Sequence, residues 1–394
     1  MKVTPEDLGI SGARLYKIDH LTRRYIDEGK LAGTISLVAR RGQIAHLQCQ
    51  GKMDIEADKP MIEDAIFRIY SMTKPITSTA LMMLYEDGNF QLNDPVSRYI
   101  PKFKDLKTYD GSPVEREMTI RDLLTHTAGL TYGFMHSNPV DKMYRDQGVE
   151  GSDSLEDMID KLSEIPLLFS PGSQWNYSVA TDVCGYLVQK ISDIPFEVFL
   201  KEQIFEPLGM LDTDFYVPEE KVHRLCSNYE YTKGGGARLL DPAESSTYLN
   251  KPKLPSGGGG LVSTAQDYFR FGQMLLNGGE LEGVQILGRK TVELMTQNHL
   301  PGNVDLNAMG QSSFSETAFD GVGFGLGFSV MLDPAKAQIL GSEGEFSWGG
   351  MASTFFFVDP SEDLLVILLT QLVPSTIYPI RRELRVTAYQ TLID

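Results

Sequence analysis

The spacing of apolar residues predicts β-strands near both ends of the chain and helices in its middle. Residues 11–29 carry apolar side chains at helical spacing and end at Gly29, which predicts an amphipathic helix. Two short β-like runs follow, 34–39 and 44–48, and residues 40–43 fit a hairpin turn between them. Beyond residue 324 the pattern is again β-like. The strands expected there are 324–331, 337–340, 353–358 and 364–369, and a last helix is expected over 378–392.

The middle of the chain reads as helices separated by loops rich in glycine and proline. A helix is expected from Ser71 to about Asp87, ending at Gly88-Asn89. Further helices are expected over 119–125, 154–165, 180–192, 196–204 and 264–277, with breaks at 170–172, 234–236 and 256–260.

This arrangement predicts an α+β fold, in which an antiparallel sheet built from both termini carries flanking helices and an inserted, mainly helical domain. The expected sheet domain is discontinuous, 1–70 and 324–394, and the inserted domain is 71–323, with the active site between them. Three loop-rich stretches, 132–152, 232–256 and 301–321, are either walls of a pocket or plain surface insertions.

Composition narrows the class of protein. A hydrophobic content of 42% and a charged content of 23% over 394 residues are typical of a globular protein with a real core. The formal net charge of −17 argues against partners with an anionic surface, so neither nucleic acid nor a membrane is expected. The N-terminus lacks the apolar segment of a secretion signal, and the three cysteines are scattered. We therefore expect a cytoplasmic protein with free thiols and no metal site, either a monomer or a homo-oligomer.

The first chemical signal is the tetrad Ser71-Met72-Thr73-Lys74 at the start of the predicted helix, the only S-x-x-K in the chain. Residues three apart on a helix share a face, so the lysine amine lies within reach of the serine hydroxyl. A nucleophile and its base can thus share one element. Taken alone, the tetrad more often marks an exposed helix that begins with a capping serine.

Two later segments add to this signal. Tyr177 lies just before the helix 180–192, where a phenol near a Ser/Lys pair can relay a proton, although most tyrosines only pack. Trp348-Gly349-Gly350 lies in a late β-like region, where missing side chains would let a substrate approach the backbone. A β-bulge or a turn would explain the same glycines.

In this order the motifs resemble the serine β-lactamase and penicillin-binding-protein superfamily, whose signature includes S-x-x-K. They are most similar to its esterases on the class C β-lactamase fold, the family VIII carboxylesterases. The stretches 119–130 and 258–265 agree, so the resemblance covers nearly the whole chain. It implies a Ser71 acyl-enzyme, with Lys74 and Tyr177 as base and proton relay. It also implies an oxyanion hole made by the backbone N–H groups of Ser71 and Met351, with no cofactor.

Two departures from the β-lactamase pattern favour neutral esters. Val179 stands where that group usually has asparagine, and Trp348 stands where it usually has a cation. Losing the cation removes a charge-assisted contact to the carboxylate of a β-lactam. We expect short-chain carboxylic esters as the small-molecule substrates. The residues expected to bind them are Trp348, Gly349, Gly350, Val179, Phe134 and Tyr144.

Several alternatives stay open. The base is either Lys74 or a Tyr177 phenolate, because a coupled pair titrates as one unit. β-Lactamase or D,D-peptidase activity, an acyltransferase on the same fold, and a non-catalytic scaffold are the competing functions. The chain has no G-x-S-x-G nucleophile elbow, and His126 is expected to be structural.

Overall fold

The centre of the molecule is an antiparallel sheet to which both ends of the chain contribute. The structure is a computed structural model and describes residues 3–310 and 318–394. Among these residues, eight strands pair in the order β10-β11-β12-β13-β14-β1-β2-β3. Their bounds are β1 Gly33–Arg40, β2 Gln43–Asp54, β3 Lys59–Pro60, β10 Val322–Phe324, β11 Ser329–Met331, β12 Phe346–Gly349, β13 Phe355–Asp359 and β14 Leu364–Leu369. Strand β1 pairs with β14 and joins the two ends of the chain, which confirms the predicted fold class.

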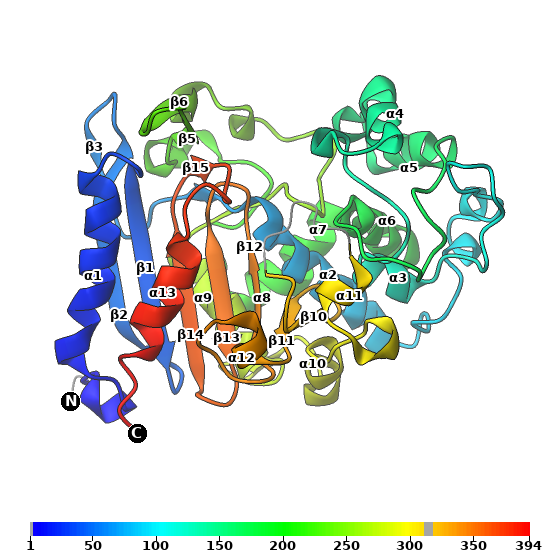
Figure 1. The fold of residues 1–394 in the computed structure, drawn as a ribbon. Helices are drawn as coiled ribbons and strands as arrows, with labels where there is room; N and C mark the ends of the chain where they lie inside the picture. The colour runs from blue at the N-terminus through cyan, green and yellow to red at the C-terminus, as the bar shows by residue number, and fades with distance from the viewer. Residues whose placement is uncertain (1–2, 311–317) are drawn as a thin grey trace.

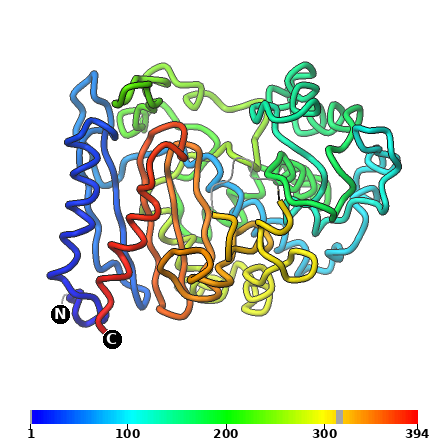
Figure 2. Tube along the Cα trace, viewed as in Figure 1, coloured from blue at the N-terminus to red at the C-terminus, as the bar shows by residue number. Residues whose placement is uncertain are grey.

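Helices α1 (Gly12–Asp27) and α13 (Ile380–Tyr389) cover one face of this sheet. Figure 1 shows them side by side across the strands, and Figure 2 shows the two chain termini next to each other at one end of the molecule. Apolar residues of both helices share one core with alternate residues of the strands. The strand residues that face this layer include Val38, Phe355, Phe357, Val366 and Leu368.

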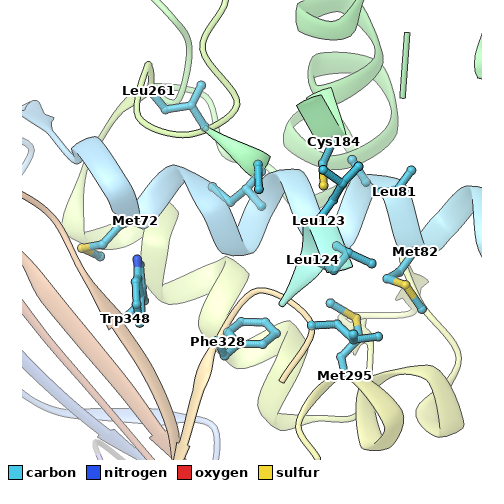
Figure 3. Close-up of a cluster of buried hydrophobic side chains, with 14 of the residues drawn as sticks. Met72, Leu81, Met82, Leu123, Leu124, Cys184, Leu261, Met295, Phe328 and Trp348 are labelled. Carbon is cyan, nitrogen blue, oxygen red and sulfur yellow. The ribbon is translucent and has the colours of Figure 1, made fainter. Parts of the chain in front are cut away.

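The other face of the sheet packs against helices from the middle of the chain. Because strand side chains alternate between faces, Phe356 and Val358 of β13 enter the second core. Helix α9 (Ala265–Leu276) packs on β14, and α2 (Thr73–Glu86) is buried along nearly its whole length. Figure 3 shows α2 crossing this core, with Trp348 and Phe328 on one side and Cys184 and Leu261 on the other. The division into domains 1–70 with 324–394 and 71–323 stays a prediction, and α9 shows that the middle segment also covers the sheet.

The helical part lies beyond α2 and is built around α6 (Ala180–Ser192), which packs on α2. Its other helices are α3 Ile120–Leu124, α4 Pro139–Gln147, α5 Leu155–Ser163, α7 Phe196–Leu200 and α8 Glu206–Leu208. The remaining helices are α10 Arg289–Met295, α11 Leu306–Met309 and α12 Pro334–Ala337. The smaller sheets contain β4 Phe67–Arg68, β5 Asn228–Tyr231, β6 Ala237–Asp241, β7 Val262–Ser263, β8 Glu280–Leu281, β9 Val284–Gln285 and β15 Leu372–Val373. No helix in the described parts of the chain is long and apolar enough to cross a membrane.

Two predicted strands are wrong in detail. The run 324–331 is the hairpin β10–β11, because Gly327 has a φ of 99° and the chain reverses there. The run 337–340 is not a strand. Pro334 opens the short helix α12, the side chain of Asp333 caps it, and Gln338 ends it in the left-handed conformation.

The three loop-rich stretches differ from one another. Stretch 132–152 contains α4, whose N-terminus is fixed by a capping box between Asn138 and Asp141. Stretches 132–152 and 232–256 both contribute walls of the cavity that Ser71 also lines. In stretch 301–321, residues 311–317 lie outside the described residues, and none of the others lines that cavity.

Candidate active site

Ser71 lies in a sharp turn that leads from β4 into α2. Residues Tyr70–Met72 form a single 3-10 turn, and Tyr70 has a φ of 43°, in the left-handed region that costs a non-glycine residue about 1–3 kcal/mol. Two contacts hold Tyr70 there. Asn228 Nδ2 donates to its hydroxyl over 3.0 Å, and its ring packs edge-to-face on Tyr248. The turn places Ser71 on the wall of the cavity.

Lys74 lies on the first turn of α2, behind Ser71. Its Nζ donates to Ser71 Oγ over 3.4 Å and to the carbonyl of Gly258 over 2.6 Å. The side chain is almost fully buried, and Nζ lies 4.4 Å from the centroid of the Tyr177 ring. The structure therefore brings Ser71, Lys74 and Tyr177 into one place, as the motifs predict.

Tyr177 is held in a group of aromatic rings just before α6. Its ring packs on His126 at 5.0 Å, Tyr132 at 5.4 Å and Trp348 at 5.5 Å between centroids. It is also stacked parallel to Trp175. Aromatic contacts on several sides fix the plane of the phenol ring.

His126 is a structural member of this group. It is fully buried, its Nδ1 lies 3.2 Å from Ser178 Oγ, and its φ of 56° is again left-handed. Burial, with a smaller contribution from the positive charge of Lys74, holds the pKa of His126 well below its usual value. A neutral imidazole packed against Tyr177 agrees with the structural role expected from the sequence.

A buried carboxylate supports the lysine from the other side. Asp182, in the first turn of α6, accepts hydrogen bonds from Ser256 Oγ over 2.5 Å and from the Gly258 N–H over 3.0 Å. Gly258 in turn gives its carbonyl to Lys74. Burial raises the pKa of Asp182, against the opposing effect of the Lys74 charge. Asp182 and Ser256 were not predicted, and helical spacing places Asp182 away from the apolar side of the predicted helix 180–192.

The cavity in front of Ser71 has a volume of about 660 Å³ and a mainly apolar wall. Five aromatic residues line it: Tyr70, Tyr132, Phe134, Phe215 and Tyr248. Met351 reaches it from the turn after β12, and Gly258–Gly260 form part of its wall. Phe134 is the member of the predicted pocket set whose side chain lies on this wall, and it is stacked on Tyr132.

Five of the six predicted substrate contacts do not line this cavity, and two of the five are Gly349 and Gly350. Trp348 and Val179 are fully buried, and Trp348 instead supports Tyr177 from behind. Tyr144 is buried too, and its hydroxyl accepts a hydrogen bond from the Thr131 N–H. The sequence can indicate that an aromatic residue lies near a pocket, but it does not indicate whether the side chain faces the pocket or the core behind it.

The two glycines after Trp348 are explained by protein packing. A Cβ on Gly349 would lie 2.6 Å from Cζ of Arg381, and a Cβ on Gly350 would lie 2.3 Å from the carbonyl oxygen of Ile69. Both spaces are filled by the protein itself, so packing accounts for the two glycines, and their contact with a substrate stays a prediction. They bring the backbone before Met351 against the turn that carries Ser71.

Fold and site together define a serine hydrolase of the β-lactamase fold. The chain belongs to the beta-lactamase family, since the family model described as "Beta-lactamase" matches residues 18–389. Within the described residues, no group of three histidine, cysteine or acidic side chains is placed to hold a metal ion.

Similarity to two related sequences and one solved structure shows which members of the family this chain resembles. It is 36% identical to Protein Rv1367c of Mycobacterium tuberculosis (strain ATCC 25618 / H37Rv) over 364 residues, 90% of this chain and 89% of that one. It is 31% identical to Esterase EstB of Burkholderia gladioli over 371 residues, again 90% and 89% of the two chains. Among solved structures, "EstCE1, a hydrolase with promiscuous acyltransferase activity" superposes with a TM-score of 0.82 and 29% identity, over 96% of this chain and 99% of that one. The resemblance to esterases of this fold is thereby confirmed.

Proposed function

We propose that this protein is a serine carboxylesterase that works through an acyl-enzyme at Ser71. The observation that carries the proposal is the position of Lys74 Nζ, 3.4 Å behind Ser71 Oγ, at the wall of a large apolar cavity. A nucleophile with a base in reach and an open, apolar space in front of it has the arrangement needed for acyl transfer. Similarity to EstB and EstCE1 supports the ester as the substrate.

The reaction has two halves. Ser71 Oγ attacks the ester carbonyl carbon and gives its proton to the Lys74–Tyr177 pair. The tetrahedral intermediate then expels the alcohol, which takes that proton. Water next attacks the acyl-enzyme, the same pair receives and returns a proton, and the carboxylic acid leaves. The N–H groups of Ser71 and Met351 would stabilise the negative oxygen in both halves, each by about 3–4 kcal/mol.

Either member of the pair fits the role of base. A neutral lysine keeps two N–H groups and one lone pair, so it can donate to the Gly258 carbonyl and still accept the serine proton. A charged Lys74 close to the Tyr177 ring would instead favour a phenolate. We keep both assignments.

The cavity indicates a substrate larger than a short ester alone. A volume of about 660 Å³ lies in the range of pockets for drug-sized ligands. The proposed substrates are neutral esters with a short acyl chain and a large, apolar alcohol, whose rings would pack on the aromatic wall. The net charge of −17 would repel polyanionic substrates. We expect the enzyme in the cytoplasm, as a monomer or homo-oligomer, acting on small molecules and not on nucleic acid or a membrane.

Acyl transfer to an alcohol is the second candidate function. The description of EstCE1 includes promiscuous acyltransferase activity, and a cavity of this size has room for an alcohol beside the acyl-enzyme. β-Lactamase or D,D-peptidase activity is less well supported, because the wall has an apolar majority and Trp348 takes the place of the cation that would hold a carboxylate.

The test is hydrolysis of p-nitrophenyl butyrate at neutral pH by the wild-type protein and by Ser71→Ala and Lys74→Ala. We expect each variant to lose at least three orders of magnitude in kcat, since nucleophile and base act as a unit. Ser78→Ala is the matched control, a buried serine of α2 that does not line the cavity. It should keep wild-type turnover. Near wild-type rates in Ser71→Ala would show that the acyl-enzyme is not formed there.

A further inference from the structure

We propose that Arg381, on the C-terminal helix α13, is a positioning residue that aims the Met351 N–H into the oxyanion hole. The inference rests on the proposed function, because it gives Met351 a part in an acyl-transfer site. It adds a residue that lies outside the cavity and outside every motif of the sequence.

Met351 lies in the tight turn between β12 and β13. The Gly350 N–H donates to the Thr354 carbonyl over 3.0 Å, and the Ser353 N–H donates to the Gly350 carbonyl over 3.0 Å. Ser353 has a φ of 68°. These bonds describe a three-residue hairpin loop that ends in a left-handed residue.

The guanidinium of Arg381 joins the two sides of this turn. Its Nη2 donates to the Gly350 carbonyl over 2.7 Å and to the Thr354 carbonyl over 2.9 Å. Hydrogen bonds from a charged donor are about twice as strong as neutral ones. The Gly350 carbonyl thus accepts from Arg381 as well as from Ser353, and its direction is fixed by both.

Holding this carbonyl also holds the N–H on the far side of the same peptide. In a trans peptide the C=O and the following N–H lie in one plane and point in opposite directions. The peptide from Gly350 to Met351 is trans. Because Arg381 draws the Gly350 carbonyl toward α13, the Met351 N–H points away from α13, and Met351 is the residue of the turn that lines the cavity with Ser71.

The surroundings of the guanidinium explain why Gly349 is a glycine. The guanidinium lies 5.7 Å from the centroid of the Phe355 ring on one side. On the other side it fills the place where a Cβ of residue 349 would be, 2.6–2.7 Å from that position. Any larger residue at position 349 would push the guanidinium off the turn.

The experiment compares an ester with its thionoester, in which sulfur replaces the carbonyl oxygen. Sulfur is a weak hydrogen-bond acceptor, so an intact oxyanion hole favours the oxygen ester strongly. We expect Arg381→Ala to lower kcat for p-nitrophenyl butyrate about 10- to 100-fold with KM nearly unchanged, and to reduce the ester-to-thionoester ratio of kcat/KM at least 5-fold. Arg381→Lys, which keeps a cation, should recover part of both losses.

Two more variants keep the test independent of folding. Gly349→Ala leaves Arg381 in the chain but displaces its guanidinium, and it should reproduce the fall in the ester-to-thionoester ratio. Arg382→Ala is the matched control, since its Nη2 donates to the Gln338 carbonyl away from the turn. It should leave both kcat and the ratio as in the wild type.

A general loss of folded protein would lower both substrates equally and leave the ratio unchanged. An unchanged ratio in Arg381→Ala and Gly349→Ala, with wild-type turnover still dependent on Ser71, would overturn the role of Arg381 alone. Turnover that survives Ser71→Ala would overturn the proposed function itself.

Discussion

At the scale of single residues, burial of His126 ties the stability of the protein to pH. Its folded pKa lies well below the usual value, chiefly through burial, whereas an unfolded chain restores a pKa near 6.5. Below about pH 6.5 the unfolded state therefore binds a proton that the folded state does not bind. Stability contributed by the neutral imidazole is present above pH 6.5 and is lost as the pH falls.

The test is the free energy of unfolding from pH 7.5 to pH 5 for the wild type and for His126→Asn. Asparagine tolerates the left-handed φ at this position and does not titrate. The difference in the free energy of unfolding between the wild type and His126→Asn should shrink as the pH falls. Its slope should approach about 1.4 kcal/mol per pH unit. His20→Asn on the exposed side of α1 is the control and should follow the wild type. Parallel curves for His126→Asn and the wild type would contradict the assignment.

Residues of the site differ in how far the sequence could reveal them. The Ser71–Lys74 contact was predictable because the 3-10 turn of Ser71 runs directly into α2, so residues three apart still face the same side. Asp182, Gly258 and Arg381 act through contacts that span tens to hundreds of positions, and no local pattern specifies them. The same limit explains Gly349, whose space is taken by Arg381 from another element.

At the scale of elements, the periodic segments were the predictable ones. Helix α1 and strands β1 and β14 carry clear helical or β patterns, and they appear at nearly the expected bounds. Short apolar runs were ambiguous, since 337–340 has a strand-like composition but follows a proline-initiated helix. Segment 132–152 looked like a loop because the capping residues of α4, rather than its apolar face, define that helix.

The ordered segment 132–152 gives the cavity one of its aromatic walls. Glu150 accepts a hydrogen bond from the Gly133 N–H and Asp141 accepts one from Thr131 Oγ1, so both ends of the segment are fixed. Phe134 is 45% exposed and lies over Tyr132 on the cavity wall. Because nearly half of this side chain is exposed, contact with a substrate would bury apolar surface that the core leaves open to solvent.

We therefore expect Phe134→Ala to raise KM for 2-naphthyl butyrate about 10-fold, the loss of roughly 1.4 kcal/mol of apolar contact. Ethyl butyrate, too small to reach the ring, should show an unchanged kcat/KM. Tyr109→Ala removes another half-exposed aromatic that does not line the cavity, and it should change neither substrate. Equal effects of Phe134→Ala on both esters would show that the ring shapes the catalytic residues rather than the substrate site.

At the scale of the whole molecule, the site is assembled from segments that are far apart in the chain. Lys74 comes from the first turn of α2 and Ser71 from the 3-10 turn just before it. Tyr177 comes from the helical part, and Met351 from a turn of the sheet. The order of strands explains how this is possible, since β1 lies beside β14 and the two ends of the chain close one sheet. Within that sheet, the turn after β12 packs against Ile69, and this contact brings Met351 to the same cavity as Ser71.

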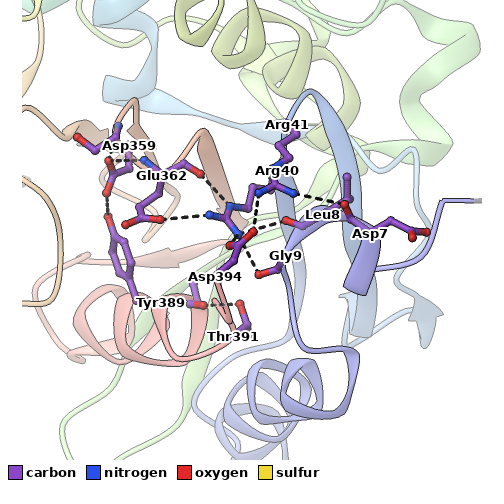
Figure 4. Close-up of polar contacts among 12 residues, drawn as sticks. Asp7, Leu8, Gly9, Arg40, Arg41, Asp359, Glu362, Tyr389, Thr391 and Asp394 are labelled. Atoms are coloured by element: carbon purple, nitrogen blue, oxygen red, sulfur yellow. Dashed lines mark hydrogen bonds and ion pairs between the residues drawn. The ribbon is translucent and has the colours of Figure 1, made fainter.

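A cluster of polar contacts lies where the two termini meet, and Arg40 at the end of β1 is its centre (Figure 4). Its guanidinium donates to the carbonyls of Leu8 and Gly9 and pairs with Asp394 over 2.5 Å. The side chain is buried, so removing it leaves the Leu8 carbonyl without a partner in a place that water reaches poorly, whereas the Gly9 carbonyl keeps the Ile393 N–H.

Arg40→Met keeps the aliphatic stem but removes the donors, and we expect it to destabilise the protein by about 1–3 kcal/mol. Arg41→Met is the matched control, because Arg41 pairs with the same Asp394 from an exposed position and such pairs contribute about 0–1 kcal/mol. Thermal unfolding should show a clear fall in Tm for the first variant and little change for the second. Esterase turnover at 25 °C should stay near the wild-type value in both, because none of these partners lines the cavity. Equal Tm values for the two variants would mean that the ends of the chain are held by their backbone bonds and helix packing, and that the buried guanidinium adds no stability beyond that of an exposed one.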